Sequence, residues 1–371
     1  MFSYGRLSAF ALGGVLLFAQ SALAETRSYA VSWFTQAMNS QAGDCPDGVN
    51  LPWKEHRLKI LRDYGFTGEQ IEAMVQEELA GKGRSPIQAF IVMRGRMNGQ
   101  PVSPYTYPAT VIDPKLHYVK GAKTSYGFNL DGQEGPASFI DPDTGEKGVD
   151  NELSRALGCM REFRGSKATP PLYWEWTWGQ LKSNQPAWLI TIEGDDLGSD
   201  GDVTVTFDRA LEHLRHNIDG SPRKDVTYRI DPDPRSHNVY AGRIEDGLVT
   251  LTAPGTAGIN LLQDPLVAVM FRMTKVNMRL GMMSDDSLDV MVGGYQPWSD
   301  LYFSFAGGGA ANESASTGDM PGIYYLFRRH ADADPDPATG QNASISATYY
   351  MRAIPAFTAA PNLKRPTLAA R

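Results

Sequence analysis

The sequence predicts a mainly β protein, with an antiparallel sandwich or barrel-like body that follows a short helical N-terminal segment. From residue 86 onward, apolar and polar residues alternate with a period of two in many short runs, as in strands with one buried face. Turn residues separate these runs, and Asp246-Gly247 between two of them is a strong hairpin signal. Many short strands joined by turns are typical of sandwiches and barrels.

The chain is expected to begin with a cleaved signal peptide at residues 1–24. Arg6 supplies the positive charge of this leader, residues 7–18 form its apolar region, and Ala22-Leu23-Ala24 is an A-x-A cleavage site. The apolar run is short for a bilayer, and no later stretch approaches a membrane span. These features indicate an exported protein, periplasmic or secreted, with no membrane span after cleavage.

Residues 25–85 are expected to form an irregular and helical segment. The apolar positions of residues 53–64 have helical spacing and end at Gly65, where a helix would stop. Thr67 with Gln70 resembles a capping box, which starts a second helix. Because such helices usually serve packing, we assign them no chemistry.

The β-rich body is expected to cover residues 86–358, and a flexible tail residues 359–371. Its strand-like runs are residues 87–97, 172–178, 188–193, 203–207, 226–230, 239–244, 248–252, 267–278, 288–292 and 345–357. Residues 297–305 and 322–331 are expected to be short helices. No period of 20–50 residues repeats, so the body is expected to be one domain and not a repeat array.

The composition argues against several classes of protein. The 371 residues are 42% hydrophobic and 21% charged, which are ordinary globular values and rule out wholesale disorder. The formal net charge of −7 becomes −8 without the leader, because the leader holds Arg6 and no acid. Such a chain without a Lys/Arg cluster is a poor candidate for binding nucleic acid. It has no P-loop and no G-x-G-x-x-G after a strand, so no nucleotide is expected.

The two cysteines, Cys45 and Cys159, are expected to form one disulfide. An even number of cysteines in an exported chain indicates a bridge rather than a reactive thiol. The chain has no C-x-x-C and no C-x-x-C-H motif, so neither thioredoxin-like chemistry nor covalent haem is expected.

Acidic, oxygen-rich loops are the most distinctive feature of the sequence. Their candidate calcium ligands are Asn129, Asp131, Asp141, Asp143, Asp150, Asp332, Asp334, Asp336 and Asn342. Alternating Asp side chains in a turn can converge on a hard cation such as Ca²⁺. The loop that begins at Asp332 is not an EF-hand, because Pro337 stands where an EF-hand has its glycine and Ala343 where it has its final glutamate. Since the same residue types make ordinary solvated turns, a structural calcium site and plain turns are both open interpretations.

A row of tryptophans is the second distinctive feature. Trp174, Trp176 and Trp178 fall on one face of an expected strand. An exposed row of indoles can stack against sugar rings and form a ligand-binding platform for a glycan. A buried row would instead fill the core, which is the commoner fate of aromatic side chains.

Three strings in the chain resemble a group of uncharacterised exported bacterial proteins. They are GFNLDG at residues 127–132, GVDNELSRALGC at residues 148–159 and GGYQPW at residues 293–298. The resemblance extends to residues 332–342. It implies export, a β-rich body and acidic loops, and it carries over no activity and no catalytic residue.

We therefore expect an exported, non-catalytic β-rich protein that binds a ligand, a glycan or an envelope partner, with calcium as a candidate stabilising ion. Two alternatives stay open. One is a hydrolase that acts on an envelope or extracellular polymer through paired carboxylates, which would face one another in a groove. The other is an accessory protein of a periplasmic enzyme, which would present a large apolar patch.

Overall fold

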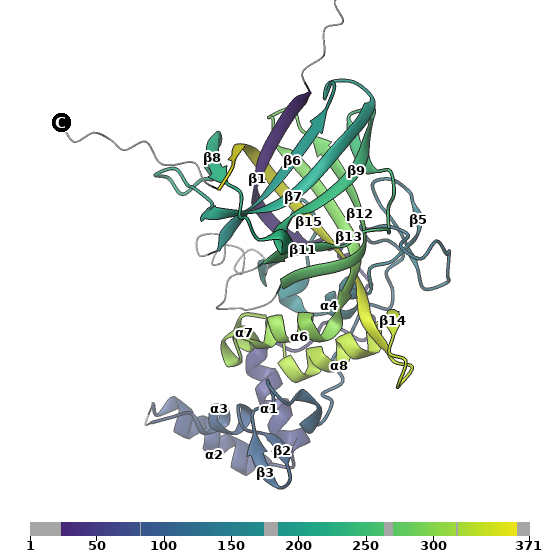
Figure 1. Cartoon of the computed structure of the whole chain (residues 1–371). Helices are drawn as coiled ribbons and strands as arrows, with labels where there is room; N and C mark the ends of the chain where they lie inside the picture. The colour runs from purple at the N-terminus through teal and green to yellow at the C-terminus, as the bar shows by residue number, and fades with distance from the viewer. Residues whose placement is uncertain (1–23, 82, 174–184, 263–269, 317, 362–371) are drawn as a thin grey trace, which may run out of the picture.

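A closed barrel of eight antiparallel strands forms the body of the protein (Figure 1). The computed structural model describes residues 24–81, 83–173, 185–262, 270–316 and 318–361. Around the barrel the strands are β1 (Glu25–Gln36), β6 (Pro186–Gly194), β7 (Gly201–His213), β9 (Asn238–Glu245), β10 (Leu248–Leu251), β12 (Met270–Met282), β13 (Leu288–Pro297) and β15 (Asn342–Ala359). Strand β15 pairs with β1 and closes the ring. The prediction of a mainly β, barrel-like body is confirmed.

The hairpin of β9 and β10 illustrates how local sequence builds the barrel wall. Residues of β9 alternate between buried and exposed along the whole strand, so one face points into the core. Asp246 and Gly247 join the two strands with φ angles of 50° and 77°, and a type I′ turn requires positive φ at both central positions. The predicted hairpin is therefore confirmed, and its turn residues explain its position.

Aromatic rings fill the barrel interior at the level of Phe34. The centroid of the Phe34 ring lies 5.2 Å from that of Trp188, 5.5 Å from that of Phe271 and 5.0 Å from that of Tyr349. Trp188 and Tyr349 are 2% and 1% exposed. An eight-stranded barrel is just wide enough to be filled by side chains, and at this level it is packed core.

Two expectations for the first hundred residues are wrong. Residues 25–36 are not irregular, because they form β1 and pair with both β6 and β15. Residues 86–91 form helix α3 (Pro86–Ile91) in place of a strand, and only β2 (Gly95–Met97) is extended in that run. The reason is local, since Ser85 Oγ accepts the N–H of Gln88 at 3.1 Å and Pro86 is preset for a first helical turn.

Helices α1 (Trp53–Asp63), α2 (Gly68–Leu79) and α3, with the hairpin of β2 and β3 (Gln100–Val102), form what we call the N-terminal helical unit. It lies at the end of the molecule away from the barrel (Figure 1). Its small core contains Leu61, Ile71 and Ile87. Thr67 and Gln70 form the predicted capping box at the start of α2.

Helices α4 (Glu152–Leu157), α6 (Trp298–Ala306), α7 (Ala310–Ser316) and α8 (Met320–His330) lie between the barrel and this unit (Figure 1). Leu153, Tyr302 and Phe327 extend the barrel core into these helices. The helices predicted near residues 297–305 and 322–331 correspond to α6 and α8. No helix in the described part of the chain is long and apolar enough to cross a membrane.

The remaining elements are short. They are β4 (Phe139–Ile140), β5 (Lys147–Val149), β8 (Val226–Arg229), β11 (Ile259–Leu262), β14 (Ala333–Pro335) and the 3-10 helices η1 (Pro108–Thr110), η2 (Arg161–Phe163) and η3 (Pro234–Ser236).

Candidate functional site

Residues 122–151, here called the cover segment, pack on the outer face of the barrel. Phe128 approaches Gly293 of β13 so closely that a Cβ there would lie 2.4 Å from the ring. Arg279 of β12 donates a hydrogen bond to the carbonyl oxygen of Gly127. The strings GFNLDG and GGYQPW therefore meet in space, because the glycine on the strand leaves room for the aromatic ring.

Asp141, a predicted calcium ligand, anchors this cover segment. Its carboxylate accepts the N–H groups of Gly127 at 3.0 Å, Asp143 at 2.9 Å and Thr144 at 3.0 Å. Arg279 Nη2 lies 3.2 Å from Oδ2 of the same carboxylate. Burial alone would raise the pKa of Asp141, but the N–H groups and the guanidinium hold it below its ordinary value.

Four further predicted calcium ligands are engaged in turns or ion pairs, as the alternative interpretation of plain turns expects. They are Asn129, which accepts from Gly132 N at 2.7 Å, Asp143, which pairs with Lys167, Asp336, which accepts from Ala338 N at 2.6 Å, and Asn342, which donates to Ala331 O at 2.9 Å.

The charges of the other four predicted ligands all act on Tyr295. Asp131 and Asp150 come from the cover segment, whereas Asp332 and Asp334 follow α8. Burial raises the pKa of the Tyr295 phenol, and the charges of all four carboxylates raise it further. We call these four residues and the neighbouring Glu152 the acidic cluster. The two loops are close enough for the charge of Asp150 to raise the pKa of Asp332.

Asp150 and Asp332 have raised pKa values within this acidic cluster. Burial is the main cause and raises the pKa of Asp150 to about 6 and that of Asp332 to about 7. Ser346 lowers the pKa of Asp332 by donating its N–H at 2.7 Å, whereas the charges of Glu152 and Asp150 raise it. Asp332 is also exposed on one side, where solvent screens its charge.

Glu152 is the member of the acidic cluster with basic partners. Its Oε1 lies 2.6 Å from Arg155 Nε, and its Oε2 lies 2.7 Å from His330 Nδ1. No ion pair of the described residues neutralises Asp150 or Asp332. Equally, no group of three or more His, Cys, Asp or Glu in that part of the chain has an arrangement that would hold a metal ion. Calcium binding therefore stays a prediction.

A groove of about 430 Å³ lies beside α8 and was not predicted from the sequence. Its lining residues, which define what we call the α8 groove, are Asp113, Tyr325, Arg328, Arg329, Gln341 and Asn342. They come from three separate parts of the chain. Of these six residues, only Asn342 was singled out from the sequence, as a candidate calcium ligand. The other five were missed because no local motif relates them.

Hydrogen bonds hold the lining of the α8 groove in place. Tyr325 Oη donates to the carbonyl oxygen of Val111 at 2.9 Å, and this hydrogen bond fixes the hydroxyl end of the tyrosine ring. Arg329 Nη1 lies 2.7 Å from Asp113 Oδ2. Arg328 donates to Gln341 Oε1 from Nη2 at 2.9 Å and from Nε at 3.2 Å.

A buried polar network, also missed by sequence reasoning, joins the N-terminal helical unit to α7 and α8. Arg94 Nη2 lies 2.5 Å from Asp319 Oδ2 and 3.9 Å from Glu313 Oε1. Tyr105 Oη donates to Glu313 Oε2 at 2.7 Å, and His56 Nε2 lies 3.6 Å from Asp319 Oδ2. All of these residues except Tyr105 are at most 3% exposed.

One guanidinium thus serves two buried carboxylates. Burial and the charge of Asp319 raise the pKa of Glu313 to about 8. Burial acts on Asp319 in the same direction, but Arg94 and His56 outweigh it and lower the pKa of Asp319. Asp319 also caps the start of α8, since its Oδ1 accepts the N–H of Gly322 at 2.7 Å. Its partner Arg94 is 225 residues away in the chain, beyond any local pattern.

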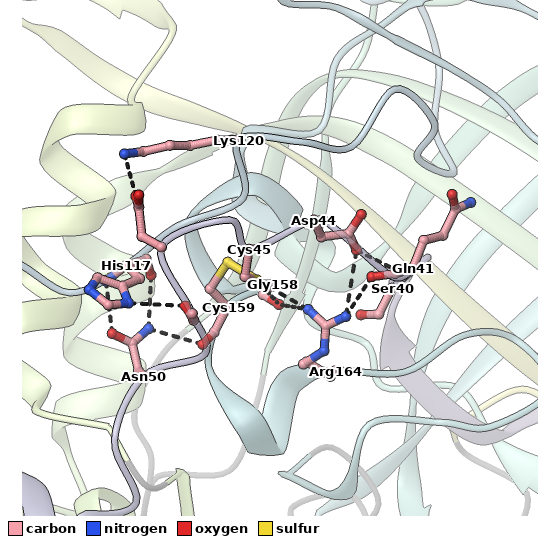
Figure 2. The surroundings of a disulfide bond; sticks show 12 residues. Ser40, Gln41, Asp44, Cys45, Asn50, His117, Lys120, Gly158, Cys159 and Arg164 are labelled. Carbon is pink, nitrogen blue, oxygen red and sulfur yellow. Dashed lines mark hydrogen bonds and ion pairs between the residues drawn. A yellow bond between two sulfur atoms is a disulfide. The ribbon is translucent and has the colours of Figure 1, made fainter.

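The predicted Cys45–Cys159 disulfide is confirmed, and it ties the segment after β1 to the end of α4 (Figure 2). Asn50 bridges the same junction, because its Nδ2 donates to the carbonyl oxygens of His117 at 2.8 Å and Cys159 at 3.0 Å. On the other side, Arg164 Nη1 lies 3.2 Å from Cys45 Sγ. These contacts indicate a structural bridge.

Comparisons of the chain with protein-family models, with curated proteins and with solved structures find no match. The geometry of the chain itself therefore carries the functional argument. The predicted ligand-binding residues Trp174, Trp176 and Trp178 lie outside the described residues, as do residues 1–23 of the predicted leader.

Proposed function

We propose that the protein is exported, has no catalytic role and binds a saccharide in the α8 groove. The lining of this groove is the observation that supports the proposal. Carboxylate, amide and guanidinium groups are planar and can bind pairs of neighbouring sugar hydroxyls, which both donate and accept hydrogen bonds. The ring of Tyr325 offers an apolar surface for the face of a pyranose. A volume of about 430 Å³ is within the usual range of small-ligand sites.

The packing of the barrel also favours a site on the outside of the molecule. Phe34, Trp188, Phe271 and Tyr349 occupy the interior at their level, so a sugar ring would have to displace packed core there. The α8 groove needs no such rearrangement.

Ligand-observed NMR with the mature, oxidised protein tests the proposal, using a set of oligosaccharides from bacterial envelopes and extracellular polysaccharides. We expect binding that Tyr325→Ala weakens about tenfold and that Tyr325→Phe preserves, because the ring faces the sugar and the hydroxyl binds Val111. Tyr107→Ala, at an exposed tyrosine outside the α8 groove, is the matched control. Absence of binding by every saccharide would contradict the proposal.

Hydrolysis by Asp150 and Asp332 is a second candidate function. Its supporting observation is that their pKa values, about 6 and about 7, suit a general acid or base near neutral pH. The measurement is release of reducing ends from the same saccharides by the wild type and by Asp150→Asn. Equal rates in both proteins and in buffer would exclude this function.

We also propose calcium as a stabilising ion at the acidic cluster. Asp150 and Asp332 face other carboxylates without a basic partner among the described ion pairs, so a divalent cation would offset their repulsion. Carboxylate oxygens are the ligands that Ca²⁺ prefers.

A further inference from the structure

The charges in the α8 groove are not balanced. Arg329 is neutralised by Asp113 at 2.7 Å, but Arg328 contacts the uncharged amide of Gln341. No carboxylate among the described residues pairs with Arg328. The six lining residues, with two arginines and one aspartate, therefore carry one surplus positive charge on a chain whose formal net charge is −7. Such a local reversal of sign favours an anionic ligand.

Gln341 also sets the direction of the Arg328 guanidinium. Its Oε1 accepts both Nε and Nη2, at 3.2 and 2.9 Å, and so occupies one edge of the planar group. The Nη1 amine has no hydrogen-bond partner in the described part of the chain. A guanidinium held in this way has lost part of its rotational freedom before a ligand arrives, and its free N–H groups match the oxygens of a carboxylate.

We infer that the α8 groove selects a saccharide that carries a carboxylate, such as a uronic acid, and that Arg328 is the residue that selects it. The inference rests on the proposed saccharide binding at the same groove. The carboxylate lies on the free Nη1 edge of Arg328, while the Gln341 amide nitrogen and the Asn342 amide oxygen can bind the hydroxyl groups, since among the described residues only the other atom of each amide is engaged. Arg329 is a weaker candidate because Asp113 already occupies it.

Calorimetric titration of the full mature protein with tri-galacturonic acid and with maltotriose tests the inference. We expect the acidic sugar to bind at least tenfold more tightly than the neutral one at low salt. Arg328→Gln should lower affinity for the acidic sugar by about ten- to a hundredfold, because a charge-assisted hydrogen bond is lost. Affinity for the neutral sugar should fall by a clearly smaller factor, because a neutral sugar loses only hydroxyl contacts with Arg328 and no charge-assisted hydrogen bond.

Gln341→Glu is a second variant that leaves Arg328 in place. The carboxylate of the new glutamate would pair with Arg328 and neutralise its charge. This variant should therefore abolish the preference for the acidic sugar, as Arg328→Gln does. Arg243→Gln, which removes an exposed arginine of β9 that pairs with Asp202, is the matched control and should change neither affinity. Thermal melts of all variants confirm that they fold.

The outcomes separate this inference from the proposed function. Equal affinity for both sugars, unchanged by Arg328→Gln, would overturn the inference and leave saccharide binding intact. If neither sugar nor any neutral saccharide binds, saccharide binding itself is wrong. Inorganic sulfate is titrated as a third ligand. If sulfate binds as tightly as the acidic sugar and its binding is equally weakened by Arg328→Gln, the assignment of a carboxylated saccharide is wrong.

Discussion

Replacing Glu313 with glutamine should remove a pH dependence of stability that the wild type shows between about pH 4.5 and pH 8. Glu313 is 0% exposed, shares the single cation Arg94 with Asp319 and lies farther from it, at 3.9 Å against 2.5 Å. Its pKa rises from 4.5 to about 8, so the folded protein keeps a proton that the unfolded chain releases. Glutamine has the shape of the protonated carboxyl and cannot titrate.

The sign follows from proton linkage. A carboxyl with a raised pKa contributes its full stability below pH 4.5 and loses it as the pH rises to about 8. Each pH unit in this window corresponds to at most about 1.4 kcal/mol of unfolding free energy. Between pH 6 and pH 8 the wild type should therefore lose roughly 2 kcal/mol relative to Glu313→Gln. Near pH 5 the two proteins should differ by less than about 1 kcal/mol.

Urea unfolding, followed by tryptophan fluorescence from pH 5 to pH 8.5, measures the difference. Asp150 and Asp332 also have raised pKa values, so the informative quantity is the gap between the two proteins at each pH. Glu193→Gln, at an exposed glutamate of β6, is the control and should track the wild type. Parallel curves for wild type and Glu313→Gln over the whole range would show that Glu313 is ionised in the folded protein, and the argument would fail.

Three further predictions concern the buried network, the disulfide and the acidic cluster. Arg94→Met leaves the buried Asp319 carboxylate without its main cation and should cost about 3–5 kcal/mol of unfolding free energy at pH 7.5. The cost, measured by urea unfolding, should be smaller at pH 5, where Asp319 can take up a proton once Arg94 is gone, and a loss independent of pH would contradict the prediction. The double variant Cys45→Ser/Cys159→Ser should lose about 4–5 kcal/mol, since the bridge closes a loop with a sequence separation of 114, and chemical reduction of the wild type should match it. Millimolar calcium should raise the melting temperature by several degrees over EDTA, magnesium should not, and Asp332→Asn should abolish the rise. Identical melts with and without calcium would remove the calcium proposal.

The sequence contains the local rules of this fold in readable form. The Asp246-Gly247 turn, the Thr67 capping box and the alternation along the barrel strands were all predicted, because each depends on residues a few positions apart. Local rules also explain the error at residues 86–91, since the cap formed by Ser85 and Pro86 competes with the strand pattern and wins. The acidic loops were recognised as unusual, but their partners were not.

By itself the sequence determined the strand-rich body, the hairpin turns and the pairing of its two cysteines, because composition, periodicity and a single pair of thiols leave few alternatives. Tertiary structure alone decided that the charges of four acidic residues from two loops act on Tyr295, that Arg94 pairs with both Glu313 and Asp319, and that Arg328 lines a groove with Asp113. Each of these contacts joins segments far apart in the chain. Closure of the barrel by β1 and β15 sets which distant segments become neighbours, and no short window of sequence contains that information.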